Sequence, residues 1–168
     1  MQTDPDFYQH TISLLVSNKP GVLIRIALVF ARRGYNLDSV VVSPSKDEKF
    51  SRMTITASGN VRTLDQIIKQ LNKLVDIIHA TDHSNDVVVE RELALIKVKC
   101  DSSQRTEILQ IAEHFRCRSV DLSKNSITLE CTGSTEKLDA LLEMLQAFEV
   151  LEMVRTGKVL MARGVEET

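Results

Sequence analysis

The sequence predicts an α+β protein made of two consecutive βαββαβ units. Stretches in which apolar residues alternate at every second position take turns with stretches in which they recur every three or four positions. The same order of strands and helices starts twice, at an interval of about 75–80 residues. Each repeat is long enough to bury a core of its own, so we expect two tandem ferredoxin-like domains.

The first repeat occupies the first half of the chain. Alternating or β-branched residues predict strands at 11–17, 37–43, 51–57 and 75–81. Residues 21–33 form the first predicted helix, which ends at Gly34. Leucines and isoleucines at helical spacing from 64 to 74 predict the second helix.

The second repeat follows a short junction at residues 83–90. Strands are predicted at 92–100, 117–122, 126–132 and, as one or two closing strands, 148–162. The predicted helices are 103–115 and 134–146, with Ser134 as the N-cap of the latter. We therefore divide the chain into domains at 10–84 and 85–168.

Composition excludes several classes of function. Hydrophobic residues make up 43% and charged residues 26% of the 168 residues, as in an ordinary globular protein. Aromatic residues are scarce, the net charge is −2, and no basic tract stands out, so no nucleic-acid partner is expected. No apolar run approaches the roughly 18 residues of a membrane span, and the first ten residues resemble no signal peptide. We expect a cytoplasmic protein, or else the mature form of an organelle protein, for example from the plastid stroma.

The first predicted helix has more apolar surface than one domain needs. Apolar residues cover most of its circumference and leave only Arg25 and Arg32 as a narrow polar strip. Deep burial within its own domain would explain this, but we favour a protein–protein contact around Ile24 and Leu28. A ferredoxin-like unit also leaves edge strands and one sheet face without cover, so a homo-oligomer is expected.

The most informative stretch joins the first strand to the first helix. Pro20 and Gly21 make a tight turn there, and the free N–H groups of the first helical turn can bind a carboxylate without a cationic side chain. Gly21 allows a ligand to approach closely, and the Asn18 amide can accept from an ammonium or donate to a carboxylate. With Asn36, where the chain re-enters the sheet, these residues suit a free α-amino acid.

A simpler interpretation of the same residues stays open. Asn-x-x-Gly before a helix is a common capping and turn arrangement, and Gly34-Tyr35-Asn36 is an ordinary helix end. On spacing alone, this alternative is the more frequent one.

Other reactive residues predict no catalytic or metal site. Cys100, Cys117 and Cys131 form no C-x-x-C pair and are expected to be buried, reduced thiols. His79 and His83 lie near several aspartates, but residues four apart on a strand are separated by roughly 13 Å. We therefore interpret them as surface polar residues. No local spacing implies a Ser/His/Asp set.

Longer stretches carry a family resemblance. SNKPGVLIRIALVFARRGYNLDSVVVSP, followed by SRMTI, resembles the N-terminal ACT domain of acetohydroxyacid synthase (acetolactate synthase) small subunits. The resemblance continues through IIKQLNKLVDI and VERELALIKV and includes TGSTEKLDALL and RTGKVLMARG. It spans nearly the whole chain, from about residue 10 to residue 164.

The resemblance implies a regulatory subunit without an active site. Such subunits bind a large catalytic subunit, raise its activity, and confer feedback inhibition by valine and other branched-chain amino acids. The holoenzyme condenses two pyruvates to 2-acetolactate and CO2, or pyruvate with 2-oxobutyrate. Thiamine diphosphate, FAD and magnesium belong to the catalytic subunit, so no cofactor is expected in this chain.

The resemblance also implies a site shared between two chains of a homodimer. The loop from one ACT domain would supply Asn18, Lys19, Pro20, Gly21, Val22 and Leu23, and the other chain would supply Asn36. The second repeat has Cys100-Asp101-Ser102-Ser103 in place of this loop, so we expect the effector site only in the domain at 10–84.

Two other functions remain as alternatives. A free-standing amino-acid sensor would need only the first domain, and the long second half argues against it. A small enzyme would turn over pyruvate by itself, whereas a regulatory subunit would only stimulate a separate large subunit.

Overall fold

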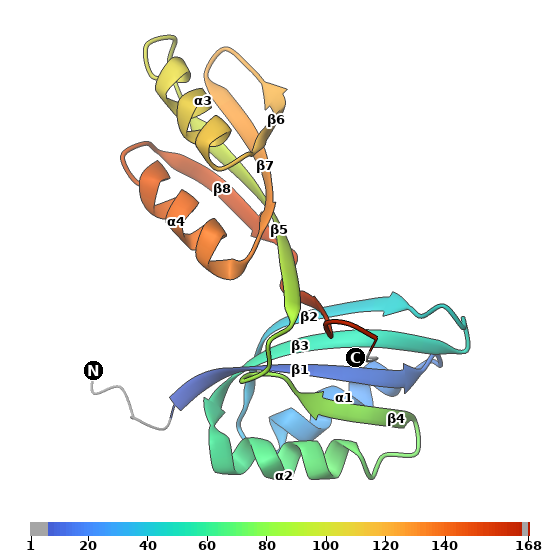
Figure 1. The fold of residues 1–168 in the computed structure, drawn as a ribbon. Coiled ribbons are helices and arrows are strands. Elements are labelled where there is room, and N and C mark those ends of the chain that lie inside the picture. Colours follow the sequence, from blue (N-terminus) through green and yellow to red (C-terminus); the bar gives the residue numbers. More distant parts are fainter. Residues whose placement is uncertain (1–6, 166–167) are drawn as a thin grey trace. The chain divides into compact units, whose positions relative to one another are not determined.

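The computed structural model describes residues 7–165 and 168, which form two compact units. The first unit extends to Val89 and also includes the segment from Lys158 onward, whereas the second comprises Glu90–Gly157. Each unit is an antiparallel sheet with two helices on one face (Figure 1). The predicted α+β class with two βαββαβ repeats is confirmed.

The sheet of the first unit has the strand order β2-β3-β1-β4. Its elements are β1 (Phe7–Ser17), α1 (Val22–Ala31), β2 (Asn36–Pro44), β3 (Phe50–Asn60), α2 (Val61–Leu71) and β4 (Ile77–Asp82). The strands β3 and β1 are central, and β2 and β4 lie at the two edges. Among the residues described, the outer side of β2 has no neighbouring strand.

The second unit repeats this pattern with the strand order β6-β7-β5-β8. Its elements are β5 (Val89–Lys99), α3 (Arg105–His114), β6 (Arg118–Leu122), β7 (Ser126–Gly133), α4 (Thr135–Leu145) and β8 (Val150–Arg155). A short strand, β9 (Val159–Met161), lies in the C-terminal segment that belongs to the first unit. The domain boundary predicted at residues 84 and 85 lies in the connection between β4 and β5, close to where the two units divide.

Each unit has its own hydrophobic core beneath its helices. In the first, Ile12, Leu14 and Val16 alternate along β1 and pack with Ile26 and Phe30 of α1. In the second, an equivalent cluster combines apolar residues of β5, β7, α3 and α4. Because side chains alternate between the two faces of a strand, this pattern fixes which face of each sheet meets the helices.

Several helices and strands begin at residues other than those predicted, because local hydrogen bonds and turns set their ends. The side chain of Asn60 accepts from the N–H of Arg62 at 2.9 Å, and this cap starts α2 at Val61. The strand predicted at 75–81 begins only at Ile77, because Val75 lies in a turn with its side chain 95% exposed. The first strand is longer than predicted and begins at Phe7, while residues 1–6 of the polar N-terminus lie outside the described part.

The outward face of α1 is exposed in the single chain. Ile24 is 66%, Leu23 49% and Leu28 45% exposed, whereas Val22, Ile26, Val29 and Phe30 face the core. Deep burial of the whole helix within its own domain was therefore the wrong alternative. No helix of the described residues is long and apolar enough to cross a membrane.

The three cysteines differ in their surroundings. Cys100 and Cys131 are buried free thiols as expected, but Cys117 is only partly buried. Partial burial, followed by the neighbouring Cys131 thiol, raises the pKa of Cys117 to about 12. Folding thus favours the protonated thiol, and this contribution to stability is present below the ordinary thiol pKa and lost as the pH rises toward 12.

We expect Cys117 to react slowly with iodoacetamide at pH 8, because the thiolate is the reactive species. Peptide mass spectrometry should show alkylation at least about tenfold slower in the folded chain than in denaturant, where the pKa returns to its ordinary value. Equal rates in the two states would contradict the raised pKa.

Candidate effector site

The predicted site begins where α1 starts without a cap. Gly21 occupies the N-cap position in the left-handed conformation, with φ of +83°, and no side chain caps the helix. The first turn contains no acidic residue, and the N–H of Val22 reaches the carbonyl of Lys19 only at 3.5 Å. The backbone N–H groups of this turn are therefore available to an anion.

Asn18 links this turn to the β2–β3 hairpin. Its backbone N–H donates to the carbonyl of Lys49 at 2.8 Å, and its side-chain Nδ2 donates to the carbonyl of Glu48 at 3.0 Å. A carbonyl oxygen can only accept, so the orientation of the Asn18 amide is fixed. The sequence left two roles open for this amide, and the structure leaves Oδ1 as the atom that can accept from an ammonium.

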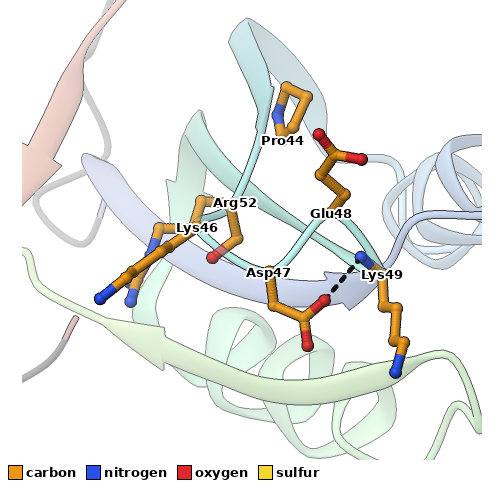
Figure 2. A pocket seen from close by; sticks show the side chains of 7 residues that line it. Pro44, Lys46, Asp47, Glu48, Lys49 and Arg52 are labelled. Carbon is orange, nitrogen blue, oxygen red and sulfur yellow. Dashed lines mark hydrogen bonds between the residues drawn. The ribbon is translucent and has the colours of Figure 1, made fainter.

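The hairpin itself surrounds an open, charged hollow of about 980 Å³ (Figure 2). Pro44, Ser45, Lys46, Asp47, Glu48, Lys49 and Arg52 line it. The N–H of Lys49 donates to the Asp47 carboxylate at 3.1 Å, which shapes the tip of the hairpin. Asn18 therefore connects the uncapped turn to a mixed-charge surface element that the sequence did not associate with it.

The remaining residues of the predicted loop differ in how far their side chains are exposed. Lys19 and Pro20 are exposed, and Leu23 is about half exposed. The side chain of Val22 is 4% exposed and belongs to the core, so Val22 can contribute only its backbone to a ligand.

Asn36 lies at the opposite end of the sheet from Asn18. It opens β2 and pairs with Ser58 of β3, which in turn pairs with Gln9 of β1, whereas Asn18 follows Ser17 at the other end of β1. The distance from Gln9 to Ser17 corresponds to roughly 27 Å of strand. One chain therefore cannot bring Asn36 to its own Asn18 and Gly21. A site that contains all three residues would need a second chain, and the role of Asn36 in another chain stays a prediction.

One ion pair beside the loop was missed at the sequence level. Nη2 of Arg25 lies 2.7 Å from Oδ2 of Asp76, in the turn before β4. A Cβ at position 21 would lie 3.3 Å from Nη1 of Arg25. The spacing of Gly21 and Arg25, one helical turn apart, was the available signal, but the contact with Asp76 depends on tertiary structure.

The corresponding connection of the second unit is occupied by its own carboxylate. Oδ1 of Asp101 accepts from the backbone N–H groups of Ser103 and Gln104, at 2.8 and 3.0 Å, just before α3. The side-chain hydrogen bond from Ser103, and then these backbone bonds, lower the pKa of Asp101. Among the described residues of the first unit, no side chain caps α1.

The interpretation of His83 as a surface residue was wrong. Its side chain is only 9% exposed, its Nε2 lies 2.8 Å from Oγ of Ser13, and its Nδ1 lies 2.8 Å from Oδ2 of Asp86. This forms a Ser–His–Asp chain of hydrogen bonds that sequence spacing could not reveal, because Ser13 and His83 are 70 residues apart. Ser13 is 7% exposed in the middle of β1, so the chain of bonds attaches the segment after β4 to the sheet.

Within the described residues, no group of three His, Cys, Asp or Glu side chains is arranged to hold a metal ion.

Comparison with known proteins places this geometry in a family. Residues 12–79 match the model of the acetohydroxyacid synthase small subunit-like ACT domain, and residues 91–164 match the model of the small subunit of acetolactate synthase. The chain is 47% identical to a probable acetolactate synthase small subunit of Methanothermobacter thermautotrophicus, over 98% of this chain and 97% of that one.

Two further similarities agree. The acetolactate synthase small subunit of Mycolicibacterium smegmatis is 44% identical over 92% of this chain and 91% of its own length. The crystal structure of the acetolactate synthase small subunit from Thermotoga maritima has a TM-score of 0.83 and 40% identity, over 94% of this chain and 98% of that chain. This chain therefore belongs to the family of acetolactate synthase small subunits, with an ACT domain in its first half.

Proposed function

We propose that the chain is a non-catalytic regulatory subunit that activates the large subunit of acetolactate synthase and makes it sensitive to valine. The uncapped first turn of α1 at Gly21 carries this proposal, because it offers backbone N–H groups to the carboxylate of an amino acid. The carboxylate binds near Gly21 and Val22, and the ammonium binds near Oδ1 of Asn18. Membership of the small-subunit family supports a large catalytic subunit as the partner. The proposed role lies in the biosynthesis of branched-chain amino acids.

The effector site is completed by a second copy of the chain. Two β2 edges that pair antiparallel place the start of one β2 beside the end of the other. Asn36 of one copy then comes to the sheet end that carries Asn18 of its neighbour. The exposed apolar face of α1, formed by Leu23, Ile24 and Leu28, gives the dimer a hydrophobic contact next to this edge.

Valine regulates the holoenzyme through this dimer. Binding must favour one arrangement of the dimer, or of its complex with the catalytic subunit, over another, because equal affinity for both would shift nothing. Thiamine diphosphate, FAD and magnesium act in the catalytic subunit, where two pyruvates become 2-acetolactate and CO2. The complex operates in the cytoplasm or, for an organelle form, in the plastid stroma.

Gly21→Asp should abolish inhibition by valine and leave activation of the catalytic subunit largely intact. The new carboxylate would occupy the anion position and pair with Arg25, while the left-handed backbone costs roughly 1–2 kcal/mol for a residue with a Cβ. Pyruvate turnover by the reconstituted holoenzyme, with and without valine, measures both effects.

Gly164→Asp is the matched control for backbone strain, because Gly164 also has a positive φ, of +76°, and lies in the C-terminal segment. This variant should keep its response to valine. If valine still inhibits the holoenzyme that contains Gly21→Asp, the site assignment is wrong. If the wild-type chain does not stimulate pyruvate turnover by the catalytic subunit, the regulatory function is wrong.

Ile24→Glu should weaken the homodimer while leaving the fold intact. A charge buried at the α1 contact is costly, but in the single chain Ile24 is 66% exposed, so folding should change little. Light scattering should show a monomer at concentrations where the wild type is dimeric, with an unchanged circular dichroism spectrum. Met144→Glu on α4, at a position 53% exposed, is the control and should remain dimeric. An Ile24→Glu dimer as stable as the wild type would exclude α1 from the interface.

A further inference from the structure

Arg25 is a cationic side chain beside the uncapped turn of α1. It lies one helical turn beyond Gly21, and its own N–H donates to the Gly21 carbonyl at 3.2 Å. Its guanidinium folds back toward the start of the helix, because a Cβ at position 21 would lie only 3.3 Å from Nη1. The glycine therefore leaves room for the guanidinium as well as for a ligand.

Asp76 holds this guanidinium in place. Its Oδ2 lies 2.7 Å from Nη2 of Arg25, and its backbone carbonyl accepts from the N–H of Ser17 at 2.8 Å. Ser17 ends β1 at the start of the loop, and Arg25 follows the loop in α1. Asp76 thus contacts the segments on both sides of the loop. It pairs with Nη2 of Arg25, while Nη1 of Arg25 lies beside Gly21.

The second unit has a carboxylate of its own in the connection that leads to its first helix. There the N–H groups that lead into α3 are satisfied by the carboxylate of Asp101. In the first unit the N-cap is a glycine, and the first turn supplies neither an acidic residue nor a side-chain cap. A carboxylate is therefore present in one repeat and missing from the other, and in the first repeat a guanidinium lies beside the open position.

We propose that Arg25 is the cation that pairs with the carboxylate of the amino-acid effector, and that Asp76 positions it. This inference rests on the proposed function and adds a residue to its site. The carboxylate lies between Nη1 of Arg25 and the backbone N–H groups after Gly21. A guanidinium suits this role because it can donate to a carboxylate and to Asp76 at the same time. Oδ1 of Asn18 then receives the ammonium.

Calorimetric titration of the purified full-length chain with L-valine and with L-valinamide tests this role. Valinamide keeps the ammonium and the isopropyl group but lacks the carboxylate. Loss of a charge-assisted contact should weaken valine binding to Arg25→Met by about tenfold to a hundredfold. Valinamide has no carboxylate to pair with Arg25. The affinities of the variant and of the wild type for valinamide should therefore agree within about twofold. General loosening of the fold would weaken the binding of both ligands, whereas loss of the Arg25 contact should weaken the binding of valine alone.

Arg32→Met is the matched control, since Arg32 is the other member of the polar strip of α1 and lies at its C-terminal end. This control should bind valine as the wild type does. Asp76→Asn should weaken valine binding less than Arg25→Met, because the guanidinium keeps its charge but loses its partner. If Arg25→Met does not fold, Arg25→Gln replaces it, because Gln removes the charge while keeping a donor for Asp76.

The outcomes separate the two proposals. If the wild-type chain binds valine and the Arg25→Met or Arg25→Gln variant binds it equally well, the role of Arg25 is overturned and the proposed function stands. Wild-type chain that binds no valine overturns the proposed function and this inference with it. Weakened binding of valine and unchanged binding of valinamide supports both.

Discussion

The start of α1 is the constraint on which the account of this protein depends. A helix begins with N–H groups that need partners, and most helices receive one from a capping side chain. Here Gly21 adopts the left-handed conformation and offers no side chain, and the rest of the first turn supplies no carboxylate. In the second unit, Asp101 accepts from the N–H groups of Ser103 and Gln104 just before α3, and the N-cap residue of α3, Gln104, makes no side-chain cap. The two connections thus differ in whether a carboxylate of the chain lies just before the helix, and the proposed effector site is in the connection without one.

The geometry of the sheet determines how many chains the site needs. Strand pairing places Asn36 level with Gln9, at the far end of β1 from Asn18. Strands in a sheet are stiff, and neither residue can cross that distance. In the proposed dimer, a second chain brought in at the β2 edge and the apolar face of α1 would place an Asn36 beside the loop. Under this proposal, oligomerisation and effector binding are coupled, which would let a small ligand influence a larger complex.

The sequence predicted the order of the elements well, because each has a clear apolar period. Ile12, Leu14 and Val16 identified β1, and the residues from Leu64 to Leu71 identified α2. Boundaries set by a single hydrogen bond were predicted less well, as at Asn60. For the site, the glycine and the asparagines were visible as a motif, although the same spacing also occurs in ordinary turns.

Contacts between distant segments could not be predicted. Arg25 meets Asp76, Asn18 meets the hairpin at Glu48, and Ser13 meets His83 only after the sheet has formed. The error for His83 has the same cause. A strand pattern fixes neighbours along the chain, but not the segment that returns to lie against the strand. The residues of the loop were therefore visible as a motif in the sequence, while the contacts that support the loop were not.

A mixed dimer tests most directly whether the effector site is shared between chains. One chain would carry Gly21→Asp, the other Asn36→Ala, and two different affinity tags would allow the mixed dimer to be purified. One of its sites then carries both defects, and the other carries neither. We predict that calorimetry will find one valine bound per mixed dimer, and none for either homodimer of the variants. If the mixed dimer binds no valine while the wild-type homodimer binds it, each site lies within one chain, and the shared-site account is wrong.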